Sequence, residues 1–235
     1  MYNLKYFIIF LLVLLILITF YKIRLNSKKI DNFTQFNFEY DNDNKLKLYE
    51  QCNFSGIGFK EDYEKGECSV AIQIIPKVKN VLEIGGGAGK VSHMINKLLE
   101  ERGLEEKHVV VEPGKDGIGN HNYDIQQNKE KFKDSYTIVN KYAEDLTMED
   151  LKLLDNSPDC LFVDCEGCLH KFFDTEIGKH CLKSARFVVN EQDSFIIKKD
   201  IKDLHQTLEN SGFTLIANGY GCGTSCLTDV WYKEN

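Results

Sequence analysis

Acidic side chains and glycines alternate in one short stretch of this sequence, and their spacing restricts the ligand they can bind. In VLEIGGGAGKVS, residues 81–92, Glu83 stands two positions ahead of Gly85, and Gly87 and Gly89 follow at the same interval. Glycines let the backbone turn sharply and approach a ligand closely. A carboxylate beside them would repel phosphates in a desolvated cleft. The pattern therefore favours a cationic cofactor that carries an amino acid over a phosphate-bearing one.

Two other glycine-rich sites fit the same stretch less well. A nucleotide P-loop needs a glycine five positions before Gly89, where this chain has Ile84. It also needs a hydroxyl side chain after Lys90, and Val91 has none. A dinucleotide turn would place its third glycine at Lys90, whose side chain would obstruct close packing of helix on strand. The P-loop is excluded and the dinucleotide turn is weakened, while a plain tight turn between strand and helix stays an alternative.

The glycine stretch resembles the first motif of the class I S-adenosylmethionine (SAM)-dependent methyltransferases. The resemblance implies that its acidic and glycine positions hold SAM. Two later segments extend it. Glu112 ends the next predicted strand, where an acidic group can accept both ribose hydroxyls. Ala143 and Glu144 follow the third predicted strand, in the region where such enzymes bind adenine, although an acidic cap at a helix start explains Glu144 nearly as well.

A second group of acids follows the fourth and fifth predicted strands. In LFVDCEGCLHKFF, Asp164, Glu166 and Gly167 resemble the D-x-E-G signature of the FkbM-type methyltransferases, which mostly methylate oxygens of sugars and other small hydroxylated compounds. RFVVNEQD resembles the fifth strand of that family and brings in Glu191. The family commonly has a second Glu where this chain has Leu169, which leaves the acceptor open. The resemblance covers about residues 67–235.

These acids have the chemistry that transfer of a methyl group to a hydroxyl needs. The protein must align the acceptor and supply a base or a metal that favours loss of the hydroxyl proton. We expect Asp164, Glu166 and Glu191 to converge beside the methyl donor. The same oxygens are suitable ligands for Mg²⁺ or Ca²⁺, but no strict ligand spacing is visible, so we favour a base that acts without a metal. A simple turn at Glu166 and Gly167 is the alternative without function.

The cysteines allow a metal site or disulfides in principle. Cys165 and Cys168, and likewise Cys222 and Cys226, have the spacing of zinc ligands. The first pair flanks a predicted turn, so we expect its thiols to point in different directions and disfavour zinc. Disulfides are expected only in a lumenal chain. Cys160 lies in a predicted strand and is interpreted as a small apolar core residue.

The elements that must position these residues alternate along the chain. Apolar runs predict seven strands, and periodic apolar spacing predicts helices between most of them. The predicted strands are 81–84, 108–113, 135–139, 159–164, 186–191, 213–218 and 229–233, and the predicted helices are 67–79, 91–103, 170–182 and 200–212. No helix separates the last two strands, which predicts an antiparallel pair. The fold class is therefore α/β, a mostly parallel Rossmann-like sheet with helices on both faces.

The N-terminal segment differs from the rest. Residues 6–21 contain no charge and would span about 24 Å as a helix, slightly less than the ~30 Å of a bilayer core. We therefore predict a membrane anchor over residues 1–25, a polar tether over 26–50 and the methyltransferase domain over 51–235. Lys22 and Arg24 after the run favour a cytosolic domain of a single-pass membrane protein, with a lumenal one left open.

Charge and composition narrow the function further. The net charge is −7, with Lys and Arg dispersed among the acids, which argues against a nucleic-acid partner. We predict a SAM-dependent enzyme that methylates a hydroxyl of a small, glycan or lipid-linked acceptor. A catalytically inactive protein of the same fold, kept for binding, is one alternative. An NAD-dependent oxidoreductase is another, although no ordered Tyr-Lys pair or His suggests it. The oligomeric state is not determined.

Overall fold

The structure, a computed structural model, describes residues 13–19, 36–104, 107–113, 121–165, 167–192, 198–221 and 226–234. The chain forms two compact units, Met1–Asn37 and Phe38–Asn235. Because their relative placement is not defined, each is described by itself. The candidate site belongs entirely to the second unit.

The first unit corrects the predicted membrane anchor. Its residues 13–19 are helical. Across the part of the chain that the structure describes, no helix is long and apolar enough to cross a bilayer. The prediction of a single-pass membrane protein, with the cytosolic placement and membrane partner that depended on it, is therefore not supported. The rest of the predicted anchor lies outside the described residues.

The second unit contains one sheet of seven strands in the order β3-β2-β1-β4-β5-β7-β6. The strands are β1 Val81–Ile84, β2 His108–Val111, β3 Thr137–Val139, β4 Cys160–Val163, β5 Phe187–Gln192, β6 Thr214–Tyr220 and β7 Leu227–Tyr232. Strands β1 to β5 run parallel. β7 is antiparallel to both β5 and β6. All seven predicted strands and the antiparallel last pair are confirmed.

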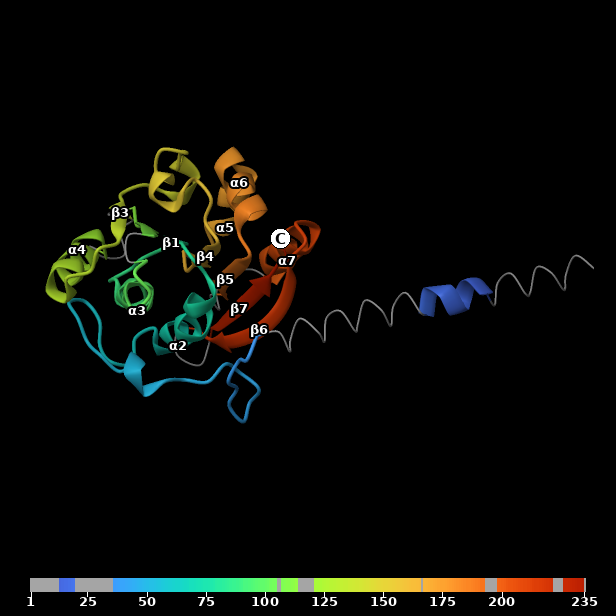
Figure 1. The fold of residues 1–235 in the computed structure, drawn as a ribbon, viewed down its shortest axis with the longest axis horizontal. Helices are drawn as coiled ribbons and strands as arrows, with labels where there is room; N and C mark the ends of the chain where they lie inside the picture. Colours follow the sequence, from blue (N-terminus) through green and yellow to red (C-terminus); the bar gives the residue numbers. More distant parts are fainter. Residues whose placement is uncertain are drawn as a thin grey trace, which may run out of the picture. The chain divides into compact units, whose positions relative to one another are not determined.

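Helices cover both faces of the sheet, as predicted (Figure 1). α2 Lys65–Ile74, α3 Lys90–Glu100 and α4 His121–Phe132 lie on one face, and α5 Leu169–Asp174, α6 Glu176–Ser184 and α7 Lys198–Asn210 lie on the other. The central strands are buried on both faces, which is why they are continuous apolar runs rather than alternating ones. One apolar core lies between the sheet and α5, α6 and α7.

The predicted helix 170–182 is in fact two helices. α5 ends at Asp174, and Thr175 caps α6, with its hydroxyl accepting a hydrogen bond from the Gly178 backbone N–H at 2.9 Å. A Cβ at Gly178 would lie 1.9 Å from the carbonyl oxygen of Phe172. The break follows from this tight approach, which the apolar periodicity of the segment does not reveal. α4 also lies in a segment for which no helix was predicted.

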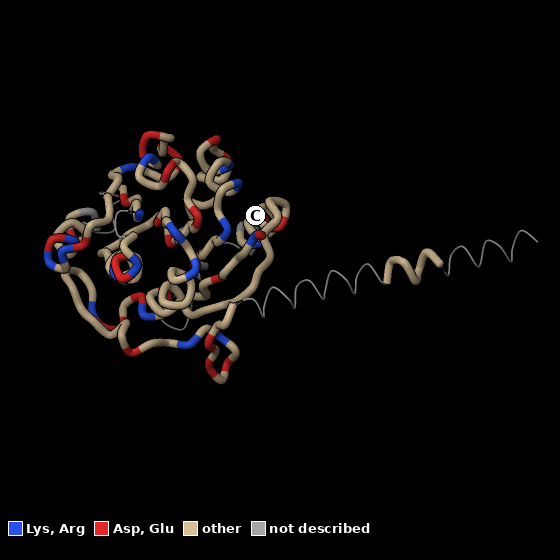
Figure 2. Tube along the Cα trace, in the orientation of Figure 1, with Lys and Arg blue, Asp and Glu red and all other residues tan. Residues whose placement is uncertain are grey.

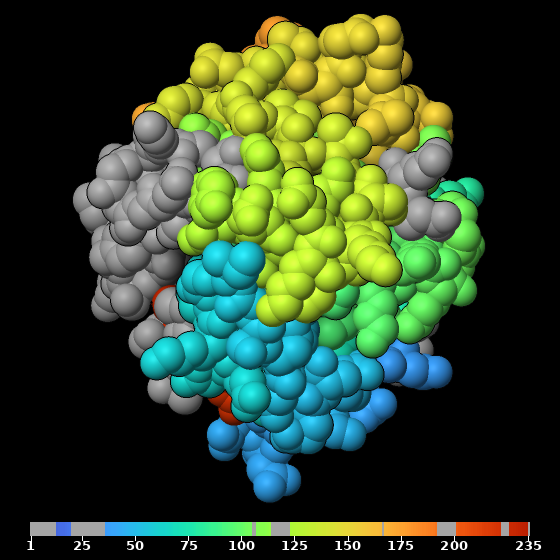
Figure 3. Space-filling model, turned by 90° about the vertical axis from the view of Figure 1, so that its left-hand side faces the viewer, coloured from blue at the N-terminus to red at the C-terminus, as the bar shows by residue number. Residues whose placement is uncertain are grey.

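Residues 38–65 wrap the second unit before the first strand. The Leu46 backbone N–H donates to the carbonyl of Asn218 in β6 at 2.8 Å, and Leu46 is fully buried. Further along, the side chain of Asn128 in α4 accepts from the Ile57 N–H and donates to the Ile57 carbonyl. The space-filling view shows residues 50–65 lying directly against the α4 region (Figure 3). This segment therefore joins the compact unit and carries residues to the site.

Candidate functional site

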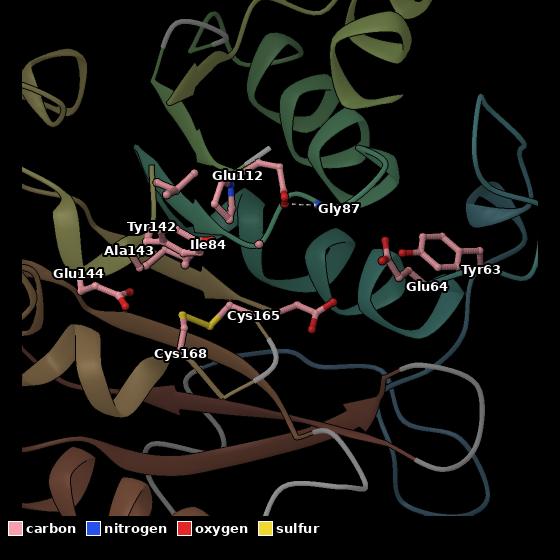
Figure 4. A pocket seen from close by; sticks show the side chains of 14 residues that line it. Tyr63, Glu64, Ile84, Gly87, Glu112, Tyr142, Ala143, Glu144, Cys165 and Cys168 are labelled. Carbon is pink, nitrogen blue, oxygen red and sulfur yellow. Dashed lines mark hydrogen bonds between the residues drawn. A yellow bond between two sulfur atoms is a disulfide. The ribbon is translucent and has the colours of Figure 1, made fainter. Parts of the chain in front are cut away.

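A cavity of about 200 Å³ opens at the carboxyl ends of β1, β2 and β4. In open α/β sheets, ligands bind at this edge, where the strand order reverses. The lining residues come from five separate segments (Figure 4): Tyr63 and Glu64 before α2; Ile84 at the end of β1 with Gly85 and Gly87 after it; Val111 at the end of β2 with Glu112 and Pro113 after it; Tyr142, Ala143 and Glu144; and Asp164, Cys165 and Cys168 after β4. Six of the predicted site residues are among them.

The glycine turn passes under the cavity with little room for side chains. Gly85, Gly87 and Gly89 all have positive φ, at 87°, 50° and 86°. A Cβ at Gly85 would lie 1.5 Å from the carbonyl oxygen of Asp164, so this position requires glycine for packing as well as for φ. Gly89 starts α3 and packs against Ile125 of α4, away from the cavity. The turn therefore brings bare backbone to the cavity at Gly85 and Gly87.

Glu112 stands at the cavity wall, directly after β2. Its side chain is buried, and its Oε2 accepts a hydrogen bond from the Gly87 backbone N–H at 2.9 Å (Figure 4). This bond joins the two predicted cofactor segments and fixes the orientation of the carboxylate. Also at the cavity, Ala143 begins the 3₁₀ helix Ala143–Asp145, with Glu144 half-buried beside it. The predicted cofactor residues Glu112, Ala143 and Glu144 thus lie around one cavity.

Glu83 lies elsewhere than the sequence suggests. It is buried, and its carboxylate oxygens are held by the Ser92 hydroxyl and by Nε2 of His108, each at 2.7 Å. His108 begins β2, the neighbouring strand, and therefore reaches the same face of the sheet. Glu83 does not line the 200 Å³ cavity. Its partners give it a structural role below the turn, and direct contact with a cofactor stays a prediction.

Asp164 is the predicted catalytic acid that the structure places at the cavity, at the end of β4. Glu191 is buried in β5 and lines a separate small cavity beside α5 and α7. Glu166 lies outside the described residues. The structure therefore brings Asp164 to the predicted cofactor segments and leaves the convergence of the three acids a prediction.

Two further acids join Asp164 from a region where no site was predicted. Glu64 caps α2 with a left-handed backbone, φ 46°, and Glu67 lies one turn further on. Both are buried. A carboxylate oxygen of each lies within 4.8 Å of the others and of one from Asp164. Acids at a helix start are common for electrostatic reasons alone, so the sequence offered no distinctive signal for Glu64 and Glu67.

Burial of several acids together changes their protonation. Burial is the main cause that raises the pKa of Glu64 to about 8, and the negative charge of Glu191 adds to it, whereas a hydrogen bond from Tyr63 opposes it. Burial, followed by the charges of Asp164 and Glu191, also raises the pKa of Glu67 well above its ordinary value. Perturbed carboxylates next to a cavity are typical of functional sites.

The cysteine prediction was wrong at this site. Cys165 and Cys168 form a disulfide that lines the cavity (Figure 4). The turn after β4 brings the two thiols together instead of pointing them in different directions, because the backbone folds back to start α5. Cys226 is disulfide-bonded as well. Cys160, as interpreted from the sequence, is a buried thiol in β4, and burial raises its pKa.

Solved structures with a similar fold include several methyltransferases. A ribosomal protein L11 methylase from Lactobacillus delbrueckii subsp. bulgaricus has a TM-score of 0.51 and 12% identity, covering 72% of this chain and 77% of its own. A candidate RNA methyltransferase from Pyrococcus horikoshii has a TM-score of 0.51 and 12% identity, covering 77% and 90%. A candidate tRNA (m1A22) methyltransferase from Streptococcus pneumoniae, in complex with SAM, has a TM-score of 0.50 and 14% identity, covering 72% of each.

These similarities show the fold. The chain has the Rossmann-like architecture found in class I methyltransferases, as the sequence predicted. No family model matches the chain, and no curated protein matches it. The resemblance to the FkbM-type enzymes therefore has no family match to support it.

Proposed function

We propose that this protein is a SAM-dependent methyltransferase that transfers the methyl group to a hydroxyl oxygen. The observation that carries the proposal is the junction of Gly87 with Glu112 at the cavity wall. This hydrogen bond joins the glycine turn after β1 to an oriented carboxylate after β2, at the carboxyl ends of two adjacent parallel strands. A cofactor with a ribose and a cationic amino-acid end fits both features. The SAM complex of the S. pneumoniae structure of similar fold is consistent with this cofactor.

The residues around the cavity fit SAM in distinct ways. Gly85 and Gly87 leave the backbone accessible, and we infer that the Glu112 carboxylate at the cavity wall accepts hydrogen bonds from the ribose hydroxyls. Ala143 and Glu144, which also line the cavity, offer a backbone N–H and a carboxylate to the adenine edge. A phosphate-bearing dinucleotide fits less well, because Glu64, Glu112, Glu144 and Asp164 all line the cavity.

The acids after β4 and before α2 supply the chemistry on the acceptor side. SAM, when bound, supplies a methyl group on a sulfonium, which leaves as neutral S-adenosylhomocysteine. The acceptor oxygen bonds to the methyl carbon while its proton passes to a carboxylate, for which Asp164 is placed at the cavity. The acceptor we propose is a small hydroxylated compound such as a sugar, with Glu166 and Glu191 contributing to its binding, as the FkbM-type resemblance implies.

Calorimetry on the full chain tests the cofactor. We expect SAM and S-adenosylhomocysteine to bind, and Glu112→Gln to weaken both by at least about tenfold, because a hydrogen bond to a charged group contributes about 1.5–3 kcal/mol. Glu101→Gln, an exposed acid after α3, is the matched control and should bind like the wild type.

The same titration distinguishes the rival functions. NADH binding in place of SAM would support an oxidoreductase, and a folded chain that binds neither ligand would leave the inactive binding protein. If SAM binds, methyl transfer from radiolabelled SAM to a panel of sugars, phenols and amines identifies the acceptor class. Label on amines but not on hydroxyls would contradict the proposed oxygen acceptor.

A further inference from the structure

Three carboxylates converge beside the large cavity and form a set that the methyl-transfer proposal does not fully use. They belong to Glu64 and Glu67 at the start of α2 and to Asp164 after β4. One oxygen of each lies within 4.8 Å of the others. A single ion at their centre could contact all three, since carboxylate oxygens bind Mg²⁺ and Ca²⁺ at about 2.0–2.6 Å.

Glu67 gives an independent reason to place a ligand among them. Its side chain has no exposed surface. Neither of its carboxylate oxygens has a hydrogen-bond partner among the described residues, yet both lie deep in the protein. A buried carboxylate without partners is costly, and buried polar groups in native proteins are nearly always satisfied. A cation in the cluster would satisfy Glu67 directly.

The cations of the protein itself are engaged elsewhere. Within the described residues, no ion pair includes Glu64 or Glu67. Lys90 is buried nearby in α3, but its ammonium donates to the Glu61 carbonyl oxygen at 2.6 Å and lies over the ring of Phe54. Its charge acts on Glu64 without a direct contact. Among the residues that the structure describes, neither Glu64 nor Glu67 is therefore neutralised by a direct ion pair.

The space beside the three acids suits one small ion. Glu64, Glu67, Glu83, Gly85 and Asp164 are among the residues around a cavity of about 10 Å³. One water molecule needs roughly 10–15 Å³ in the same measure, so an ion of water size or smaller fits. Glu64, Gly85 and Asp164 also line the 200 Å³ cavity. An ion here would therefore lie at the boundary between the two spaces.

We propose that Glu64, Glu67 and Asp164 bind one divalent cation with oxygen ligands, Mg²⁺, beside the cofactor cavity. Three carboxylates leave coordination positions for water and for an acceptor oxygen, as is usual for Mg²⁺ sites. The bound ion orients the acceptor hydroxyl and favours loss of its proton. This role in the reaction rests on the proposed methyl transfer, whereas binding of the ion does not. In this proposal a bound metal ion takes the place of the metal-free base that was favoured from the sequence.

Titration of the full chain with Mn²⁺, followed by electron paramagnetic resonance without SAM, tests the site. We expect one bound Mn²⁺ that Mg²⁺ displaces. Glu67→Gln keeps the size of the side chain but removes a ligand, and should weaken Mn²⁺ binding by at least about tenfold. Asp164→Asn should weaken Mn²⁺ binding to a similar extent. It is the second test variant if near-ultraviolet circular dichroism shows that Glu67→Gln does not fold. Glu101→Gln should bind Mn²⁺ like the wild type.

The outcomes separate this site from the proposed function. No Mn²⁺ bound by folded wild-type chain, or unchanged Mn²⁺ affinity in both Glu67→Gln and Asp164→Asn, overturns the metal site even if SAM binds. If the wild-type chain binds one Mn²⁺ but no SAM, and the variants lose the Mn²⁺, the metal site is supported and the proposed methyltransferase function is rejected. Because Glu67 does not line the larger cavity, Glu67→Gln should retain SAM affinity in the absence of metal.

Discussion

At the residue scale, the close approach of two chain segments explains the glycine at position 85. The residue has φ 87°, and its missing Cβ would lie 1.5 Å from the backbone oxygen of Asp164. Because that oxygen is backbone, it cannot move aside as a flexible side chain would. The turn and the end of β4 are therefore held in contact, and this contact places Asp164 beside the segments predicted to bind the cofactor.

We predict that Gly85→Ala lowers the free energy of unfolding by about 3 kcal/mol or more, through positive φ and overpacking together. Gly103→Ala is the matched control: its φ is 65°, but nothing lies within 4 Å of its Cβ position. The control should lose only about 1–2 kcal/mol. Urea denaturation measures both, and equal losses would contradict the importance of the contact.

Glu83, a residue of the glycine motif, is held by hydrogen bonds inside the protein. Its carboxylate takes hydrogen bonds from Ser92 in α3 and is paired with His108 in β2. We predict that Ser92→Ala destabilises the protein by about 1.5–3 kcal/mol, since it removes a hydrogen bond to a buried charged group. Ser157→Ala, at an exposed position, should change stability by less than about 0.5 kcal/mol. Thermal unfolding measures both, and a Ser92→Ala variant as stable as the control would mean that this bond contributes little.

At the element scale, the contact of α2 with the end of β6 positions the acidic cluster. A Cβ at Gly66 would lie 2.2 Å from the carbonyl oxygen of Tyr220, and one at Gly219 would lie 2.4 Å from the side chain of Val70. Two glycines on facing elements thus allow α2 to approach the sheet edge closely. Glu67, one position beyond Gly66, is buried because of this approach.

The disulfide after β4 connects the start of α5 to the cavity. We predict that Cys168→Ser, or reduction, weakens SAM binding severalfold, because Cys165 and Cys168 both line the cavity. Their sequence separation is only 3, so the loss of stability should be no more than about 2 kcal/mol. Calorimetry with and without a phosphine reductant measures the affinity.

Cys226→Ser is the control for that experiment, since reduction also affects the disulfide of Cys226. In Cys226→Ser, the reductant should still weaken SAM binding as it does in the wild type. An affinity that does not change in Cys168→Ser would show that the disulfide is not needed for the shape of the cavity.

At the scale of the whole molecule, the net charge and its distribution indicate whether the protein can bind a nucleic acid. The net charge is −7, and in the second unit acidic and basic residues are interspersed along the trace (Figure 2). Two of the solved structures of similar fold are described as candidate RNA or tRNA methyltransferases. RNA binding relies on several Lys or Arg contacts to phosphates, and because these contacts release counterions, the affinity falls steeply as the salt concentration rises.

We therefore predict that this protein does not bind RNA measurably at moderate salt. Fluorescence anisotropy with a labelled tRNA and a labelled single-stranded RNA, at about 50 and 200 mM salt, tests this. A SAM-binding chain that also binds RNA with a steep salt dependence would replace the small hydroxylated acceptor with a nucleic acid. A basic protein such as lysozyme confirms that the labelled RNAs report binding.

The sequence by itself determined the sheet and most of the residues that line the cavity among those predicted to bind a cofactor. Strands buried on both faces must be continuous apolar runs, and glycines with positive φ are needed where a strand turns sharply into a helix. The position of Glu112 at the cavity was predictable as well, because the end of a parallel strand next to the glycine turn faces the ligand edge in this architecture; its contact with a cofactor stays a prediction. These features depend on residues close together in the sequence.

Only the tertiary structure decided which acids lie close together. Glu64 and Glu67 reach Asp164 because α2 packs closely against the sheet through Gly66, a contact between segments far apart in the sequence. Glu83 is held inside the fold because the register of β1 and β2 brings His108 to it. The disulfide depends on the path of the turn after β4. Such long-range contacts arise from packing of whole elements, and local patterns of residue type do not encode them.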